Sequence, residues 1–338
     1  MLRQIENPPN PYESQYVEWL GPPPKAEVQV YEEEAKSILS KNDSPDVDFT
    51  WSVNPYRGCF HACAYCYARP SHEYLGFGAG TDFDTKIVVK KNAADLLRSE
   101  FMKSKWQGEQ VVFSGDTDSY QPLEATWRLT RKCLEVCAEF RNPVGVITKS
   151  PLIQRDIDIF QQLKRDASIH VIISVAFTDD EMARKVEPHA PNPSTRFEAL
   201  KNLSDAGIST SVLVAPIIPG LNDRQIPQVL QRASECGAES AGRILLRLPG
   251  SVQPVFMERM GKAFPQRIVK IENRIRDSRG GEMNKSQFFE RFRGQGEYWE
   301  GIEQLFKVNA RKYGLEGHMA EPGVSTFRRP GPRQMELF

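Results

Sequence analysis

Three cysteines lie close together near the start of the chain, in the segment NPYRGCFHACAYCYARP at residues 54–70. Cys59, Cys63 and Cys66 follow the spacing C-x3-C-x2-C. Thiolates are soft ligands that hold zinc or iron–sulfur clusters. A structural zinc ion needs four ligands, and the fourth candidate in this segment, His61, lies inside the loop. A [4Fe–4S] cluster on three cysteines leaves one iron free to bind a substrate or cofactor. We therefore expect a cluster here, with a zinc loop or a chance grouping as the alternatives.

The other three cysteines do not form a second C-x2-C pair. Cys133 and Cys137 are four residues apart on a predicted helix and Cys236 ends another, so we expect small hydrophobic core residues. Six cysteines in 338 residues, without the basic and apolar start of a secretion signal, favour a reducing cytoplasm over a disulfide framework. No apolar run reaches the roughly 18 residues of a transmembrane helix, so we expect no membrane partner.

The elements that must position these cysteines alternate between short β-branched runs and amphipathic helical stretches. Parallel strands need crossover connections, so the alternation predicts an α/β fold, either an open doubly wound sheet or a partial (β/α)6 barrel similar to a TIM barrel. In both, ligands bind at the carboxyl ends of the strands. The predicted strands are Thr50–Val53, Val111–Ser114, Val144–Thr148, His170–Ala176, Ser209–Ala215 and Gly242–Leu248. The predicted helices are Ala93–Lys103, Leu123–Glu139, Leu152–Arg165, Ser194–Ala206 and Asp223–Cys236.

Composition divides the chain into four expected regions. These are an irregular, proline-rich leader at 1–48, the barrel at 49–250, a helical basic extension at 251–316 and a flexible tail at 317–338. Although the net charge is zero, residues 1–50 contain 4 Lys and Arg against 10 Asp and Glu, whereas residues 240–314 contain 15 against 8. The basic region suits a polyanionic partner, with a solvated surface as the alternative.

The cysteine motif, with Tyr65 before its third cysteine, resembles the signature of radical S-adenosylmethionine (SAM) enzymes. The resemblance covers roughly residues 50 to 250. It implies that the open iron of a [4Fe–4S] cluster chelates the amino and carboxylate groups of SAM. One electron, from a donor such as a flavodoxin or ferredoxin, then cleaves SAM to methionine and a 5′-deoxyadenosyl radical.

The same resemblance assigns cofactor-binding roles to residues at successive strand ends. Ser114, Gly115 and Asp116 stand where members of the family receive the amino group of SAM, and Tyr65 belongs to the cysteine motif. Lys149 is expected to pair with the methionine carboxylate and Ser174 to bind the ribose hydroxyls. The expected apolar bed for adenine is Ala215, Pro216 and Ile217. For each of these residues an ordinary structural role is the alternative.

Several segments resemble the spore photoproduct lyase branch, a photolyase-like DNA repair group. They are CAYCYARP, TKS, ISV, EPHAPNPSTRFEAL and VAPIIPGLND. Spore photoproduct lyases use a cysteine at the end of the second strand as a hydrogen-atom donor, whereas this sequence has Asp116 there. A carboxyl group is a poor hydrogen-atom donor, so reversal of the spore lesion is in doubt. Tyr120, as a catalytic residue, or Tyr67 can relay a hydrogen atom instead, with a packed tyrosine as the alternative.

The last five residues, Gln334, Met335, Glu336, Leu337 and Phe338, resemble the pentapeptide with which bacterial DNA polymerases and repair proteins bind the sliding clamp. Leu337 and Phe338 are apolar anchors suited to a preformed groove, and Gln334 can hydrogen-bond at its edge. The alternative is a terminus that folds back on its own domain.

These observations predict a radical SAM enzyme that acts on DNA, in lesion repair or base modification, and is recruited by the sliding clamp. The alternatives are a radical SAM enzyme acting on RNA or a small molecule, and a non-catalytic iron–sulfur module that binds DNA or the clamp. The residues expected to contact nucleic-acid phosphate are Arg247, Arg274, Arg276 and Arg279.

Overall fold

A computed structural model describes residues 27–317 and 325–331. Its main sheet has seven strands in the order β10-β9-β8-β7-β6-β3-β2. The six strands from β3 to β10 pair in parallel, and β2 pairs with β3 antiparallel at one edge. The fold is therefore the expected partial (β/α)6 barrel. Its strands are β2 (Leu39–Lys41), β3 (Trp51–Val53), β6 (Val111–Phe113), β7 (Val144–Thr148), β8 (Ile169–Ser174), β9 (Ser209–Ile217) and β10 (Ser240–Leu245).

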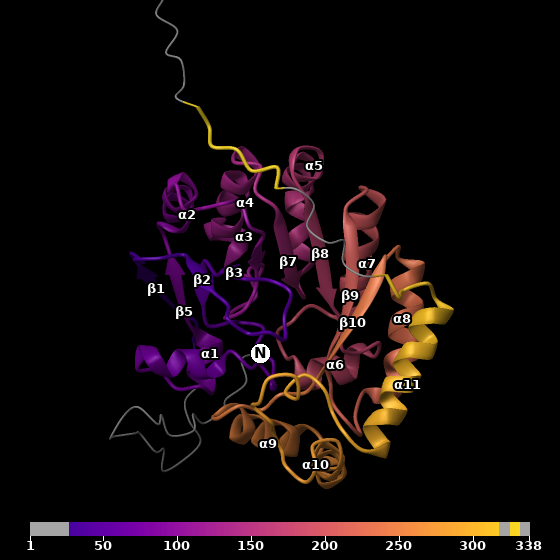
Figure 1. The fold of residues 1–338 in the computed structure, drawn as a ribbon. Helices are drawn as coiled ribbons and strands as arrows, with labels where there is room; N and C mark the ends of the chain where they lie inside the picture. The colour runs from indigo at the N-terminus through magenta and orange to yellow at the C-terminus, as the bar shows by residue number, and fades with distance from the viewer. Residues whose placement is uncertain (1–26, 318–324, 332–338) are drawn as a thin grey trace, which may run out of the picture.

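Helices cover the outer side of the arc of strands, and α9 and α10 lie at its lower end (Figure 1). The largest hydrophobic core lies between strands and outer helices, and a second core joins the strand ends to α9 and α10. The barrel helices are α2 (Ala93–Met102), α3 (Glu124–Trp127), α4 (Leu129–Glu139), α5 (Ile157–Asp166), α6 (Asp180–Val186), α7 (Pro193–Asp205) and α8 (Ile226–Glu235). Short 3-10 helices are η1 (Arg69–Leu75), η2 (Pro151–Asp156) and η3 (Asp223–Gln225), and the C-terminal helices are α9 (Val252–Ala263), α10 (Ile268–Asp277) and α11 (Glu297–Lys312).

A second, three-stranded sheet braces the beginning of the barrel. It has the order β1-β5-β4, with β1 (Gln29–Glu33) parallel to β5 (Lys86–Lys90) and β4 (Tyr56–Arg57) antiparallel to it. The short helix α1 (Thr81–Thr85) runs directly into β5. This sheet was not expected from the sequence, and it fixes the chain on both sides of the cysteine loop.

The six strands predicted from the sequence coincide with the six parallel strands, with ends shifted by up to three residues. The predicted helix 123–139 is two helices, because Arg128 adopts a left-handed backbone with φ 54°. Gly207 follows α7 with φ 77°, a conformation that glycine adopts without steric cost. None of the helices in the described part of the chain has the length and apolarity that crossing a bilayer requires.

Two expected boundaries differ from the structure. Within the expected leader, residues 27–48 contain β1 and β2, and β2 hydrogen-bonds to the main sheet. Within the expected flexible tail, residues 325–331 pack on the barrel, where the Phe327 ring lies 6.0 Å from the rings of Phe101 and Phe140. Both segments are ordered because they cover strand edges and aromatic side chains that would otherwise face water.

Candidate active site

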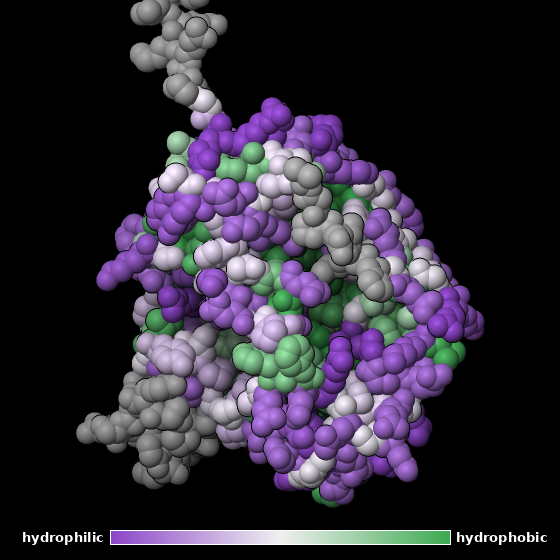
Figure 2. Space-filling view, viewed as in Figure 1, coloured by the Kyte–Doolittle hydropathy of each residue, from purple (hydrophilic) through white to green (hydrophobic). Residues whose placement is uncertain are grey.

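A pocket of about 530 Å³ opens at the carboxyl ends of the parallel strands. Figure 2 shows hydrophobic atoms at the bottom of a hollow near the centre of the molecule, with hydrophilic side chains around it. All three motif cysteines line the pocket. The other predicted cofactor-binding residues that line it are Tyr65, Ser114, Gly115, Asp116, Lys149, Ser174, Ala215 and Pro216. The fold therefore brings these residues together at the carboxyl ends of the strands.

The cysteine loop is held in shape by its neighbours in the fold. Gly58, with φ 76°, opens the loop, and a Cβ there would lie 3.0 Å from the carbonyl oxygens of Phe83 and Lys86. Glycine is therefore required at this close approach. The amide of Cys59 donates to the Phe83 carbonyl at 3.0 Å, and Ala62 has φ 55°, so the loop turns back on itself between its first two cysteines.

The three thiols are free and suited to a cluster. Burial raises the pKa of Cys63 to about 12 and also raises the pKa of Cys59 and Cys66. Among the described residues, no three His, Cys, Asp or Glu side chains converge on a single metal ion. A cubane instead offers a separate iron to each thiolate, so its ligands stand further apart. Three soft donors on one loop that faces the pocket fit such a cluster.

Behind the motif, Tyr65 is tied to a buried ion pair. Its hydroxyl donates to Glu187, and Glu187 pairs with Arg196, whose side chain is fully buried. Burial opposes the charge of Glu187, but Arg196 and Lys149 hold its pKa below the usual range. The ammonium of Lys149 lies 5.8 Å from the centre of the Tyr65 ring. Burial also opposes the charge of Lys149, yet the neighbouring Cys63 and Glu187 raise its pKa. This cation is therefore ready to meet a carboxylate in the pocket.

Asp118, which the sequence analysis did not select, organises the floor of the pocket. It accepts hydrogen bonds from the Thr148 hydroxyl at 2.6 Å and from the Lys149 amide at 2.9 Å, and His61 Nδ1 lies 3.5 Å from its carboxylate. Burial opposes its ionisation, but His61, Lys149 and Thr148 keep the pKa of Asp118 below its usual range. Asp118 could have been selected from the sequence, because it lies two residues after Asp116 in the segment that follows β6.

The wall formed by the end of β6 brings backbone close to the pocket. Gly115 has φ 120°, and a Cβ there would lie 3.3 Å from the Asn54 amide nitrogen. The amide of Asp116 donates to the Asn54 side chain at 3.0 Å, while its own carboxylate lines the pocket. At the opposite wall, the Ser174 hydroxyl donates to the carbonyl of Ala215 at 3.3 Å. Small and polar groups thus border both sides of a space that a nucleoside can fill.

The mouth of the pocket combines cations with aromatic rings. The Arg247 guanidinium lies 4.9 Å from the centre of the Phe292 ring and 5.7 Å from that of Tyr67. Its Nε is buried without a hydrogen-bond partner, and burial, with the nearby Arg291, lowers its pKa. Arg291 is itself paired with Asp46 at 2.6 Å. Among the described residues, no carboxylate forms an ion pair with Arg247, although Asp46 is near enough to favour its charged form.

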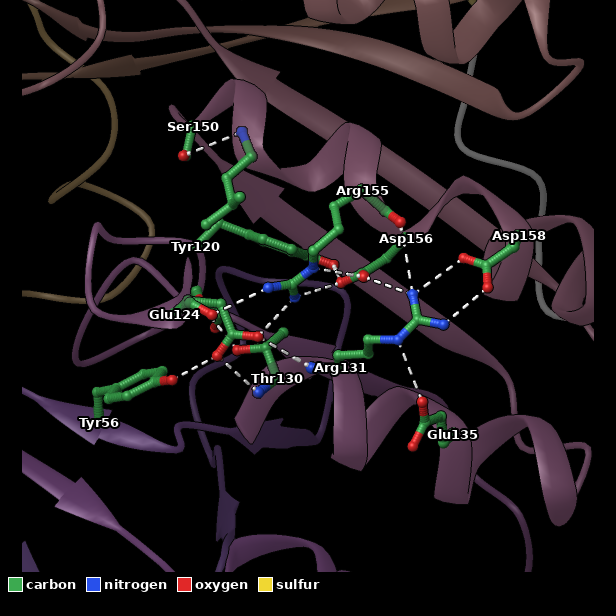
Figure 3. A network of polar contacts seen from close by, with 12 residues as sticks. Tyr56, Tyr120, Glu124, Thr130, Arg131, Glu135, Ser150, Arg155, Asp156 and Asp158 are labelled. Carbon is green, nitrogen blue, oxygen red and sulfur yellow. Dashed lines mark hydrogen bonds and ion pairs between the residues drawn. The ribbon is translucent and has the colours of Figure 1, made fainter. Parts of the chain in front are cut away.

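Tyr120 lies in the core and does not line the pocket. Its side chain is fully buried and its hydroxyl donates to Asp156 at 2.9 Å, within the polar network of Figure 3. Arg131 and Arg155 bind the same carboxylate, and Arg155 also binds Glu124. The structure therefore gives Tyr120 a packing role, because its hydroxyl is already engaged away from the pocket. Tyr67, the other tyrosine considered for hydrogen-atom transfer, does line the pocket.

Four further predicted residues lie outside the pocket. Ile217 is fully buried in the core beside it. Arg279 is also buried and donates to the carbonyls of Leu246, Glu290 and Arg291, so it is not available to phosphate. Arg274 and Arg276 lie on α10 and pair with Asp277 and Glu272. The clamp-type motif at 334–338 lies outside the described residues.

Comparisons with known proteins agree with this geometry. A model of the radical SAM superfamily matches residues 53–233, more than half of the chain. A Mycobacterium tuberculosis protein described as uncharacterized is 35% identical over 252 residues, 74% of this chain and 74% of that protein. The radical SAM Nα-GlyT isomerase of Pseudomonas phage M6 is 25% identical over 233 residues, 68% of this chain and 46% of the isomerase.

The fold is also found among solved structures. Spore photoproduct lyase complexed with dinucleoside spore photoproduct matches with a TM-score of 0.59 at 14% identity, over 84% of this chain and 79% of the lyase. A serine-for-cysteine variant of that lyase matches with a TM-score of 0.60 at 15% identity, over the same shares of both chains. The family match establishes that the chain belongs to the radical SAM superfamily, whose cofactors are a [4Fe–4S] cluster and SAM.

Proposed function

We propose that this radical SAM enzyme acts on a nucleotide within DNA, in lesion repair or base modification. The observation that carries the proposal is the Arg247 guanidinium, whose buried Nε has no hydrogen-bond partner and which lies beside two aromatic rings at the pocket mouth. A phosphate gives this cation an ion-pair partner, and a base stacks on the rings of Tyr67 or Phe292. Lys41 and Arg291 line the same pocket, where they are paired with Asp43 and Asp46.

We assign the cofactor contacts to those predicted residues that line the pocket. We assign the cluster to Cys59, Cys63 and Cys66, and its chemistry when bound is the reductive cleavage of SAM to a 5′-deoxyadenosyl radical. Lys149 holds the methionine carboxylate and Asp116 accepts from the ammonium group. The remaining assignments are Tyr65 and Gly115 beside the methionine, Ser114 beside the amino group, Ser174 on the ribose, and Ala215 and Pro216 against the adenine.

We expect the pocket walls to shield a bound, reactive substrate from water. Asp118 contributes by fixing Thr148 and the backbone of Lys149 at the floor. Asp116 stands where spore photoproduct lyases carry their hydrogen-donating cysteine, so we infer a reaction other than reversal of the spore lesion. Tyr67, at the pocket wall, is the residue of this chain placed to pass a hydrogen atom.

Two relatives support a nucleic-acid substrate. A solved spore photoproduct lyase holds a dinucleoside photoproduct, and the phage relative is described as an Nα-GlyT isomerase. We extend the proposal to recruitment by the sliding clamp through 334–338, to a flavodoxin or ferredoxin as electron donor and to a cytoplasmic location. The alternatives are an RNA or small-molecule substrate and a non-catalytic iron–sulfur module.

The decisive experiment is anaerobic reconstitution of the full chain, followed by measurement of 5′-deoxyadenosine. We expect its formation with dithionite and SAM, and a severalfold increase with irradiated or modified double-stranded DNA. The Cys63→Ala variant is expected to form none, and Cys137→Ala, a buried core cysteine, serves as the matched control. Stimulation by RNA and not by DNA would favour the second substrate class, and absence of cleavage under all conditions would contradict the enzyme assignment.

A further inference from the structure

Two buried arginines support the cysteine loop from behind. Arg69, three residues after Cys66, donates from Nη2 to the carbonyl of Cys63 at 2.7 Å. Arg259, on α9, donates from Nη1 to the carbonyl of Ala62 at 2.8 Å across 197 positions of sequence. Both arginine side chains are fully buried. The carbonyls of Ala62 and Cys63 are thus held by guanidinium groups from different parts of the fold.

Asp84, on α1, joins the two arginines. One of its carboxylate oxygens accepts from Arg69 at 2.8 Å and the other accepts from Arg259. Arg69 further donates to the carbonyls of Ala79 and Gly80. Removing ionic groups from water costs several kcal/mol each, so a chain gains little stability from such a triad compared with apolar packing. The hydrogen bonds of the triad to the cysteine loop therefore point to a role other than stabilising the fold.

We propose that Arg69, Asp84 and Arg259 are positioning residues that hold the cysteine loop and set the reduction potential of the cluster bound there. The inference rests on the assignment of the cluster to Cys59, Cys63 and Cys66 made under the proposed function. Each of the three groups carries a fixed charge in a water-poor part of the protein, where Coulomb interactions are weakly screened.

The sign of each effect follows from electrostatics. Reduction adds an electron to the cluster, so a nearby positive charge stabilises the reduced form and raises the potential, whereas a negative charge lowers it. Arg69 and Arg259 therefore raise the potential and Asp84 lowers it. Because Arg259 belongs to α9, the C-terminal region takes part in tuning a cluster that the N-terminal loop binds.

The test is an EPR-monitored redox titration of the reconstituted full chain, with iron content and thermal unfolding measured in parallel. We expect Arg69→Gln and Arg259→Gln to shift the midpoint potential to more negative values, and Asp84→Asn to shift it to more positive values. Arg259→Lys, which keeps the charge, should return the potential toward that of the wild type. Arg98→Gln, at an exposed pair with Glu139, is the matched control and should leave it unchanged.

Opposite shifts of the midpoint potential in the Arg and Asp variants indicate an effect of charge. A loosened loop would instead shift the potential of all these variants in the same direction. Variants that retain iron but show no shift, or shifts of one sign for the Arg and Asp changes, would overturn the proposal. If a Gln variant stays folded and loses iron, the holding role is supported, and Asp84→Asn and Arg259→Lys then decide the electrostatic role. If the wild type itself binds no cluster, the proposed function fails instead, which the iron analysis shows directly.

Discussion

Among single residues, Arg247 most directly links the pocket to the class of substrate. We expect Arg247→Gln to weaken binding of a labelled oligonucleotide by about tenfold, because a hydrogen bond to a charged group contributes about 1.5–3 kcal/mol. The slope of log affinity against log salt should also fall by about one. Fluorescence anisotropy at several salt concentrations measures both quantities.

A charge-conserving variant and a surface variant control that experiment. Arg247→Lys keeps the positive charge but loses the planar contact with Tyr67 and Phe292, so we expect intermediate affinity. Arg98→Gln removes a cation that is already paired with Glu139 and should have little effect. Equal affinities for wild type and Arg247→Gln would show that the guanidinium does not meet the substrate.

His170 offers a residue-scale test of acid sensitivity away from the pocket. Its ring nitrogens lie 2.9 Å from the Ser209 hydroxyl and 2.8 Å from that of Ser211. Burial lowers its pKa, and Glu239, the charged group that faces it, opposes this effect. A base whose pKa is depressed by folding contributes full stability above its unfolded pKa and loses it as the pH falls below that value.

We therefore expect acidification from about pH 7.5 to about pH 5.5 to destabilise the wild type more than His170→Gln. Urea unfolding of both proteins at each pH measures the two losses in unfolding free energy. The buried His72 and the half-buried His189, whose pKa values are also lowered, are common to both proteins and cancel in the comparison. Identical losses would show that His170 does not contribute to the acid sensitivity.

Sequence reasoning located those site residues whose positions are fixed by short-range order. Three cysteines on one loop must be near one another. Lys149 follows β7 and Ser174 ends β8, and the carboxyl ends of these strands meet at one edge. Arg291 and Phe292 could not be found in this way. They belong to the irregular segment 278–296, which has no periodicity and reaches the pocket through tertiary contacts alone.

At the scale of elements, structure that depends on the local sequence pattern was likewise predicted, whereas structure that depends on tertiary contacts was not. Buried parallel strands such as β7 are rich in β-branched residues, so their existence and order were predicted. The second sheet was missed because β4 contains two residues and β1 is largely exposed, although Ile87, Val88 and Val89 in β5 carried a strand signal. The break between α3 and α4 was missed because arginine is ordinarily a helix-forming residue.

That break provides a prediction about backbone strain. Arg128 has φ 54° and is exposed, and the left-handed conformation costs a non-glycine residue about 1–2 kcal/mol. We expect Arg128→Gly to leave the free energy of unfolding unchanged or raise it by up to about 1 kcal/mol. Arg128→Val should lower it, because a β-branched side chain is still less tolerated there. Chemical denaturation measures both changes, and a clear loss of stability in the glycine variant would contradict the left-handed break.

At the scale of the whole molecule, the pocket is assembled by both ends of the described chain. Asp46 binds the side chain of Arg291 and the amide of Phe289, so segments almost 250 residues apart in sequence close the mouth together. Arg259 likewise joins α9 to the cysteine loop. Cofactor binding and substrate access are therefore expected to depend on the extension as well as on the barrel.

The C-terminal segment 325–331 separates the barrel from the proposed clamp motif. The Arg328 amide donates to the Phe140 carbonyl at 2.8 Å, and Arg329 donates to the carbonyls of Lys103 and Trp106. The half-buried Phe327 packs among Phe101 and Phe140. The last of these contacts is made by Arg329, and the motif begins at Gln334, outside the described residues. Attachment and clamp binding can therefore be separated by mutation.

We expect deletion of residues 334–338 to abolish capture of the bacterial sliding clamp in a pull-down, while the melting temperature and 5′-deoxyadenosine formation stay unchanged. Phe327→Ala should do the reverse, lowering the free energy of unfolding by about 1–3 kcal/mol through lost aromatic packing while clamp capture persists. Exchange of Leu337 and Phe338 for alanine should match the deletion, because these two side chains supply the apolar anchors. Clamp capture that survives the deletion would show that the terminal pentapeptide is not the binding element.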